Sequence, residues 1–226
     1  MQTTYRGLTI HYRDQLEMDT LLEEEFKKNQ YYVDLPTNTP LIIDGGAHIG
    51  TSTLYLHSLY PHARFICIEP DPANIELLSK NLEENDIDQA TIISKALVGA
   101  DSLPSVKLFT NHTFTVLSSL KVGGWTGEDK LEAIDVETIR LSEIITEPVD
   151  LLKLDIEGME TVVIEEAQSK LSLVKNLILE FHKTKTHSEE KILRILKNHF
   201  KTVNVIRDSR KERNKNNLLL MIEATK

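Results

Sequence analysis

The sequence predicts an α/β fold with a mostly parallel β-sheet and helices on both faces. Three apolar runs, over 41–43, 65–68 and 151–154, have the length and composition of strands that are buried on both faces. A helical pattern follows each run, and strands that alternate with helices indicate βαβ units. The 226 residues are enough for one such domain with a sizeable core.

Composition narrows the class of protein further. The net charge of −9 argues against binding to the phosphate backbone of nucleic acid or to an anionic membrane. The single cysteine, Cys67, lies in an apolar run, so we expect it in the core and expect no internal disulfide. The sequence has neither a run of about 18 apolar residues nor a signal-peptide pattern. We therefore expect a cytoplasmic, single-domain enzyme or binding module.

The first of these runs leads into a glycine-rich turn, LIIDGGAHIG over 41–50. A strand, such a turn and a helix form a nucleotide-binding βα unit, in which glycine lets a ligand approach the backbone. The spacing Asp-x-Gly-x-x-x-Gly differs from the Gly-x-Gly-x-x-Gly of dinucleotide enzymes. Asp44 would repel a pyrophosphate but would suit an ammonium group, as in S-adenosylmethionine (SAM). The alternative is a tight turn in which Asp44 only caps the helix.

A second acidic residue, Glu69, ends the strand over 65–68, 19 residues after Gly50. A carboxylate at about this spacing usually binds the two ribose hydroxyls of a nucleotide. Asp71 and Pro72 then predict the start of a helix, and a strand over 91–94 leads to a segment, 95–97, where an adenine could lie. The alternative for Glu69 is an exposed residue at the end of a strand.

Three polar residues, Asp155, Glu180 and His182, follow or end two further predicted strands. Ligands bind at the carboxyl ends of strands in open parallel sheets. His182 is the best candidate for a general base, since its ordinary pKa lies near 6.5, with Asp155, Glu157 or Glu180 to orient or replace it. Two alternatives remain: His182 belongs to the core, or Asp155, Glu180 and His182 together bind a divalent metal.

Residues 1–40 form an N-terminal extension to the main domain, which covers 41–226. LTIHY predicts a short strand, and 19–28 predicts a helix with Asp19 as its N-cap. The extension either forms a lid over the ligand or packs against the edge of the sheet. A loop around Trp125 either closes over substrate or is a surface turn, and the basic segment 207–217 is either a solvated hairpin loop or a contact for an anionic substrate.

The remaining pattern completes the domain. Within 99–140 we expect strands or a hairpin, formed by VKLF, FTVLSSL and AIDVETIRL. Helical spacing or an amphipathic stripe predicts helices over 51–59, 160–171 and 189–200. The last predicted strands cover 202–206 and 218–224.

Several segments of the chain resemble the FkbM family of SAM-dependent methyltransferases. In order, they are IIDGGAHIGTSTL, ICIEPDPANIELLSKNL, FTVLSSL, the strand before LSEII, LLKLDIEGME and NLILEFH. The resemblance covers about residues 38–183, and its specific part is LKLDIEGME combined with LEFH. His48 stands where asparagine is more usual.

The resemblance implies a class I methyltransferase fold, with a seven-stranded sheet whose last strand is antiparallel. It also implies O-methylation of a small-molecule or peptide-like acceptor, such as a polyketide or a sugar. The residues that it implies for binding SAM are Asp44, Gly45, Gly46, Ala47, His48, Gly50, Thr51, Ser52, Glu69, Pro70, Asp71, Asn74, Lys95, Ala96, Leu97 and Asp155.

Other functions would share some of these sequence features. A nicotinamide-dependent reductase would need the other glycine spacing. A nucleic-acid amino-methyltransferase usually has an Asn/Asp-Pro-Pro-aromatic motif where this chain reads DIEG. Methylation of a carboxylate or an amine stays open, as does a non-catalytic module that only binds SAM.

Overall fold

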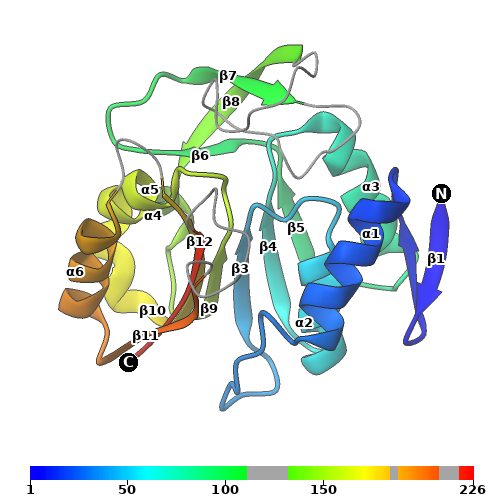
Figure 1. Cartoon of the computed structure of the whole chain (residues 1–226), viewed down its shortest axis with the longest axis horizontal. Helices are drawn as coiled ribbons and strands as arrows, with labels where there is room; N and C mark the ends of the chain where they lie inside the picture. The colour runs from blue at the N-terminus through cyan, green and yellow to red at the C-terminus, as the bar shows by residue number, and fades with distance from the viewer. Residues whose placement is uncertain (111–131, 184–187, 209–218) are drawn as a thin grey trace.

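A seven-stranded sheet forms the centre of the computed structural model, which describes residues 1–110, 132–183, 188–208 and 219–226 (Figure 1). Its strand order is β11-β12-β10-β9-β3-β4-β5. β12 runs antiparallel to both of its neighbours, and the other pairs are parallel. The bounds are β3 (Leu41–Gly45), β4 (Arg64–Ile68), β5 (Ala90–Ile93), β9 (Val149–Leu154), β10 (Val174–His182), β11 (Thr202–Asp208) and β12 (Leu219–Thr225). The predicted fold class is confirmed.

Helices cover both faces of this sheet, and each layer encloses its own hydrophobic core (Figure 1). Neighbouring residues of β3 point to opposite faces, so Ile43 belongs to one core and Ile42 to the other. Cys67 is buried in the same core as Ile42, as predicted. One layer contains α2 (Thr51–Leu59) and α3 (Pro72–Glu83), and the other contains α4 (Leu141–Ile144), α5 (Glu160–Glu166), the 3₁₀-helix η3 (Ala167–Leu173) and α6 (Glu189–His199).

Local sequence signals explain where several helices begin. The Asp71 side chain accepts a hydrogen bond from the backbone N–H of Ala73, and Pro72 occupies the first turn of α3. Ser188 caps α6 in the same way. The single helix predicted over 160–171 is instead α-helical only as far as Glu166 and continues as η3.

The N-terminal extension packs on the layer that contains α2 and α3, and not on the edge of the sheet. It consists of a hairpin of β1 (Gln2–Tyr5) and β2 (Leu8–His11), followed by α1 (Gln15–Leu21) and the π-helical turn η1 (Leu22–Lys27). Hydrogen bonds join the backbone N–H and C=O of His11 to the side-chain amide of Asn81 in α3. The prediction of Asp19 as N-cap is wrong. Asp14 caps α1 by accepting from the N–H of Glu17, so the helix starts earlier and Asp19 lies within it.

A smaller sheet lies above the carboxyl ends of the main strands (Figure 1). β8 (Glu132–Arg140) pairs antiparallel with β7 (Ser105–Thr110), in the region where the sequence predicts strands or a hairpin, and pairs in parallel with β6 (Ala96–Val98). The predicted strand FTVLSSL lies outside the described residues. The Trp125 loop and residues 209–217 of the basic segment lie outside the described residues. Within the described part of the chain, no helix is long and apolar enough to cross a membrane.

Candidate active site

The turns that follow β3 and β9 touch each other at the carboxyl edge of the sheet. Gly46 has a φ of 75°, and a Cβ added there would lie 1.8 Å from the carbonyl oxygen of Asp155. Only glycine permits both this backbone conformation and this approach. The glycine-rich turn therefore fixes the distance between two strand ends that both carry candidate site residues.

A first cavity, of about 660 Å³, opens between the ends of β3, β4 and β9. Nine of the predicted cofactor residues line it: Gly46, His48, Glu69, Pro70, Asn74, Lys95, Ala96, Leu97 and Asp155. Apolar residues complete its wall, among them Ile68, Leu108, Ile156 and Met159. A flat apolar group with a polar edge, such as a nucleoside, suits this lining.

Glu69 is held in place within this cavity by three hydrogen bonds. Its Oε1 accepts from the backbone N–H of Asp71 at 3.0 Å and from the amide of Asn74 at 3.2 Å, and its Oε2 accepts from the N–H of His48 at 2.9 Å. Burial raises the pKa of Glu69 to about 7, against the opposing effect of these donors. His48 itself has a φ of 52°, a left-handed conformation that asparagine adopts readily.

A second cavity, of about 1070 Å³, adjoins the first. Its lining includes Glu17, Glu25 and Tyr31 of the N-terminal extension, together with Glu180 and His182 at the end of β10. The lining also includes Gly46, Ala47 and His48 of the glycine-rich turn, and Thr51 and Ser52 at the start of α2. The residues shared by the two cavities are Gly46, His48, Asp155 and Glu157, so the cavities meet at Asp155.

Asp44 lies behind the glycine-rich turn. It is fully buried, accepts hydrogen bonds from the hydroxyls of Ser52 and Thr53 at 2.6 and 2.7 Å, and forms an ion pair with Lys153 at 3.0 Å. The Lys153 ammonium also donates to the carbonyl of Gly46 at 2.7 Å. Four of the predicted cofactor residues are not among the described residues that line the two cavities: Asp44, Gly45, Gly50 and Asp71.

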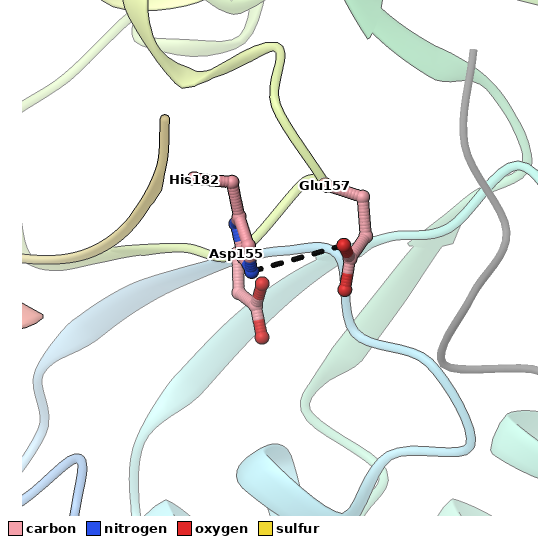
Figure 2. Close-up of side chains that lie close together, drawn as sticks. All are labelled: Asp155, Glu157 and His182. Atoms are coloured by element: carbon pink, nitrogen blue, oxygen red, sulfur yellow. Dashed lines mark ion pairs between the residues drawn. The ribbon is translucent and has the colours of Figure 1, made fainter. Parts of the chain in front are cut away.

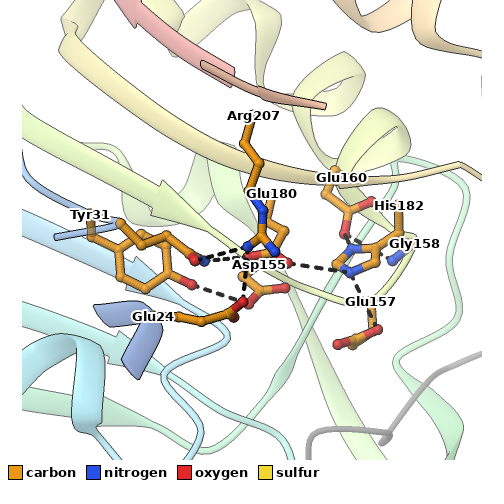
Figure 3. Close-up of polar contacts among 10 residues, drawn as sticks. Glu24, Tyr31, Asp155, Glu157, Gly158, Glu160, Glu180, His182 and Arg207 are labelled. Atoms are coloured by element: carbon orange, nitrogen blue, oxygen red, sulfur yellow. Dashed lines mark hydrogen bonds and ion pairs between the residues drawn. The ribbon is translucent and has the colours of Figure 1, made fainter. Parts of the chain in front are cut away.

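His182 lies among carboxylates from three elements (Figures 2 and 3). Its Nδ1 is 3.1 Å from Oε1 of Glu160, and its Nε2 is 3.7 Å from Glu157 and 3.9 Å from Glu180. Burial lowers the pKa of His182, but Glu157, Glu160 and Asp155 outweigh it, and the net pKa lies well above the ordinary value. The surrounding carboxylates therefore favour the protonated form of the imidazole.

Asp155 and Glu180 lie on the other side of this cluster, against the N-terminal extension (Figure 3). The Tyr31 hydroxyl donates to Oδ2 of Asp155 at 3.4 Å, and the Gln30 amide donates to Oε2 of Glu180 at 2.9 Å. Burial raises the pKa of both carboxyls. Oδ1 of Asp155 is buried and accepts no hydrogen bond from any described residue, so it is available to a ligand.

Comparison with known proteins identifies the family to which the chain belongs. The family model described as "Methyltransferase FkbM domain" matches residues 44–203. The chain is 30% identical over 206 residues to methyltransferase sdnD of Sordaria araneosa, with 76% of this chain and 78% of that protein covered. This chain belongs to the FkbM methyltransferase family.

Two further proteins are similar. Methyltransferase 1 of Beauveria bassiana is 25% identical over 185 residues, which cover 73% of this chain and 74% of that protein. The crystal structure of methyltransferase FkbM from Methylobacillus flagellatus matches with a TM-score of 0.56 and 16% identity, over 89% of this chain and 47% of that chain. The FkbM domain here thus spans about half the length of that structure, and the likeness shows the fold.

The cofactor of this FkbM methyltransferase is SAM, as predicted. The lining of the two adjoining cavities suits the successive chemical groups of SAM. The first offers a buried carboxylate, Glu69, beside apolar walls for a nucleoside, and the junction offers the unpartnered buried oxygen of Asp155 to a cation. The second cavity then leaves space for the rest of the cofactor and for an acceptor.

Three side chains of the FkbM domain lie close enough together to bind a metal ion, but they are not the same three that the sequence suggested. Ligand atoms of Asp155, Glu157 and His182 lie within 4.8 Å of one another (Figure 2), whereas the sequence-based alternative named Glu180 in place of Glu157. Oxygen and imidazole ligands of this kind would suit a divalent ion.

Sequence reasoning missed several residues of this site. Lys153 was detectable, because a lysine inside an otherwise apolar buried strand, LLKL, needs a buried acidic partner. Glu160 stands five residues after Asp155 in LDIEGME, yet only the fold shows that it, and not Asp155 or Glu180, bonds Nδ1 of His182. Glu25, Gln30 and Tyr31 come from the extension, where no sequence signal connected them with the site.

Proposed function

We propose that this FkbM methyltransferase transfers the methyl group of SAM to a hydroxyl oxygen of a small molecule. The acceptor would be a polyketide, a sugar or a peptide-like compound, and it would bind in the second cavity beside β10. The observation that carries this proposal is His182, whose Nδ1 is held by a buried glutamate and whose Nε2 lies with Glu157 and Glu180 in that cavity. A base held at the junction of two cavities suits proton removal from a hydroxyl.

The residues have separate tasks in this reaction. Glu69 binds the ribose hydroxyls, and 95–97 border the adenine. Bound SAM supplies a methyl group that its sulfonium already activates, so the chain mainly has to align the acceptor. As the acceptor oxygen bonds to the methyl carbon and the carbon–sulfur bond breaks, the hydroxyl proton passes to Nε2 of neutral His182. Because the pKa of His182 is raised, the proportion of the neutral form that can accept this proton increases with pH.

The test combines product analysis with one variant. Isotopically labelled methyl donor, incubated with candidate acceptors or a cell extract, should yield a product labelled on oxygen. We expect His182→Ala to bind SAM normally in calorimetry and to lose about 10²- to 10⁴-fold in turnover, the usual contribution of a general base. A label found on nitrogen or on a carboxylate would contradict hydroxyl methylation, and normal turnover of His182→Ala would move the base role to a carboxylate.

A further inference from the structure

We propose that Glu25, on the π-helical turn of the N-terminal extension, binds the amino-acid end of SAM in the second cavity. The family match begins at residue 44, so it assigns no role to Glu25. The inference concerns the cofactor and does not depend on which acceptor the enzyme methylates. It would make the extension part of the cofactor site rather than only a cover.

Glu25 has a buried polar atom for which the chain provides no partner. The side chain lines the second cavity, although the residue is only 5% exposed. Its Oε1 accepts a hydrogen bond from the Thr51 hydroxyl at 3.1 Å, while its Oε2 has no hydrogen-bond partner among the described residues. Because a buried polar group without a partner is unfavourable, this oxygen indicates a ligand that completes the bond.

The order of groups in SAM places its amino-acid end near this oxygen. The proposed function, on which this step rests, places the nucleoside in the first cavity against Glu69; the sulfur would then lie near the shared residue Asp155, and the amino-acid end would continue into the second cavity. The lining of that cavity includes Glu180 and His182 at the end of β10, and also Glu25 and Thr51, the latter in the first turn of α2. The amino-acid end is assigned to Glu25 and Thr51.

The protonation state of Glu25 decides whether its free oxygen donates or accepts a hydrogen bond. Burial raises the pKa of Glu25 to about 8; Lys153 and the Thr51 hydroxyl oppose this, and Asp44 and Asp155 add to it. The buried phenols of Tyr31 and Tyr55 also lie close enough to interact with this carboxyl. At neutral pH the acid form predominates, so Oε1 can accept from Thr51 while the Oε2 hydroxyl donates. A donor beside the N-terminus of α2 suits the carboxylate of the cofactor rather than its ammonium.

The decisive experiment compares two nucleosides that differ only at the amino-acid end. S-adenosylhomocysteine has this end, and 5′-methylthioadenosine lacks it. Calorimetry at pH 7 should show that Glu25→Ala weakens S-adenosylhomocysteine binding by about 10- to 100-fold, as expected for loss of a hydrogen bond to a charged group. Binding of 5′-methylthioadenosine should stay the same, and Glu25→Gln, which keeps a donor, should retain most of the affinity for S-adenosylhomocysteine.

Glu23→Ala is the matched control, because Glu23 lies on the same turn but is exposed and paired with Lys27. It should leave both affinities unchanged. Equal weakening of both ligands by Glu25→Ala would overturn the proposal, since the effect would not concern the amino-acid end. Unchanged binding of both ligands would overturn it as well. If Glu25→Gln bound S-adenosylhomocysteine as weakly as Glu25→Ala, the donor role would be wrong.

Discussion

The buried carboxylate of Glu160 and the imidazole of His182 lie 3.1 Å apart, and this contact joins the start of α5 to the end of β10 (Figure 3). Glu160 is fully buried and is itself fixed by a hydrogen bond from the backbone N–H of Gly158 at 2.9 Å. The pair therefore orients the ring so that Nε2 points toward Glu157 and Glu180. A carboxylate in this position also favours the charged form of the imidazole.

Glu160→Gln tests the electrostatic part of this contact. The variant keeps a hydrogen-bonding side chain but removes a negative charge, so the pKa of His182 should fall toward its ordinary value. We expect the acidic limb of the kcat/KM profile to move to lower pH by about one unit. Glu165→Gln is the control, because Glu165 is an exposed acid on the same helix that pairs with Lys191. An acidic limb at the wild-type pH in Glu160→Gln would show that another group controls it.

Because Asp44 forms a buried ion pair with Lys153, replacing Asp44 should destabilise the protein and not merely remove a contact with a ligand. Both side chains are almost completely buried, and removing one partner leaves an uncompensated charge. We expect Asp44→Ala to lower the free energy of unfolding by about 3–5 kcal/mol, measured by denaturant unfolding without SAM. Loss of SAM binding in that variant would then follow from the displaced glycine-rich turn. A variant as stable as the wild type that still failed to bind SAM would instead indicate direct contact.

Much of the fold could be predicted from the sequence because its signals are local. The apolar run and glycines over 41–50 predict a buried strand and turn, and Asp71 with Pro72 marks the start of α3. The start of the N-terminal helix was misplaced because both Asp14 and Asp19 are acceptable caps, and only the position of the preceding β2 hairpin selects Asp14. Such a choice depends on tertiary structure rather than on propensity.

Position at a strand end predicts part of the candidate site, whereas the family resemblance implies other residues, such as Asn74 within α3. Glu69 and Asp155 stand at strand ends, and both line the first cavity. Asp44 also does so, but its side chain turns away because a buried lysine on the neighbouring strand pairs with it. Contacts between the extension and the site, such as Tyr31 with Asp155, join residues more than 120 positions apart, and no spacing rule in a single sequence connects them.

A chelation experiment tests the metal alternative at Asp155, Glu157 and His182. We expect turnover to survive dialysis against a chelator, because the proposed proton transfer to Nε2 of His182 requires no metal ion. The measurement is initial rate before dialysis, after it, and after addition of Mg²⁺, Mn²⁺ or Zn²⁺. Activity that disappears and returns with one of these ions would assign His182 to metal binding and would remove it as the base.

Glu25 also predicts how stability depends on pH. Its pKa is about 8 in the folded chain and 4.5 as the reference value, so the folded state holds a proton that the unfolded state releases. The contribution of Glu25 to stability is therefore complete below about pH 4.5 and is lost as pH rises toward 8, by up to about 1.4 kcal/mol per pH unit. Glu69, Asp155 and Glu180 change stability in the same direction, because their pKa values are raised too.

Subtracting the unfolding free energy of Glu25→Gln from that of the wild type isolates this contribution, because the other acids are present in both proteins. We expect the difference to decline from pH 5 to pH 8 and to level off above it, when measured by urea unfolding without SAM. Glu23→Gln, at an exposed site, should give a difference that does not vary with pH. A flat difference for Glu25→Gln would mean that Glu25 is already ionised in the folded chain. It could then accept a hydrogen bond from the ammonium of the cofactor but could not donate one to its carboxylate.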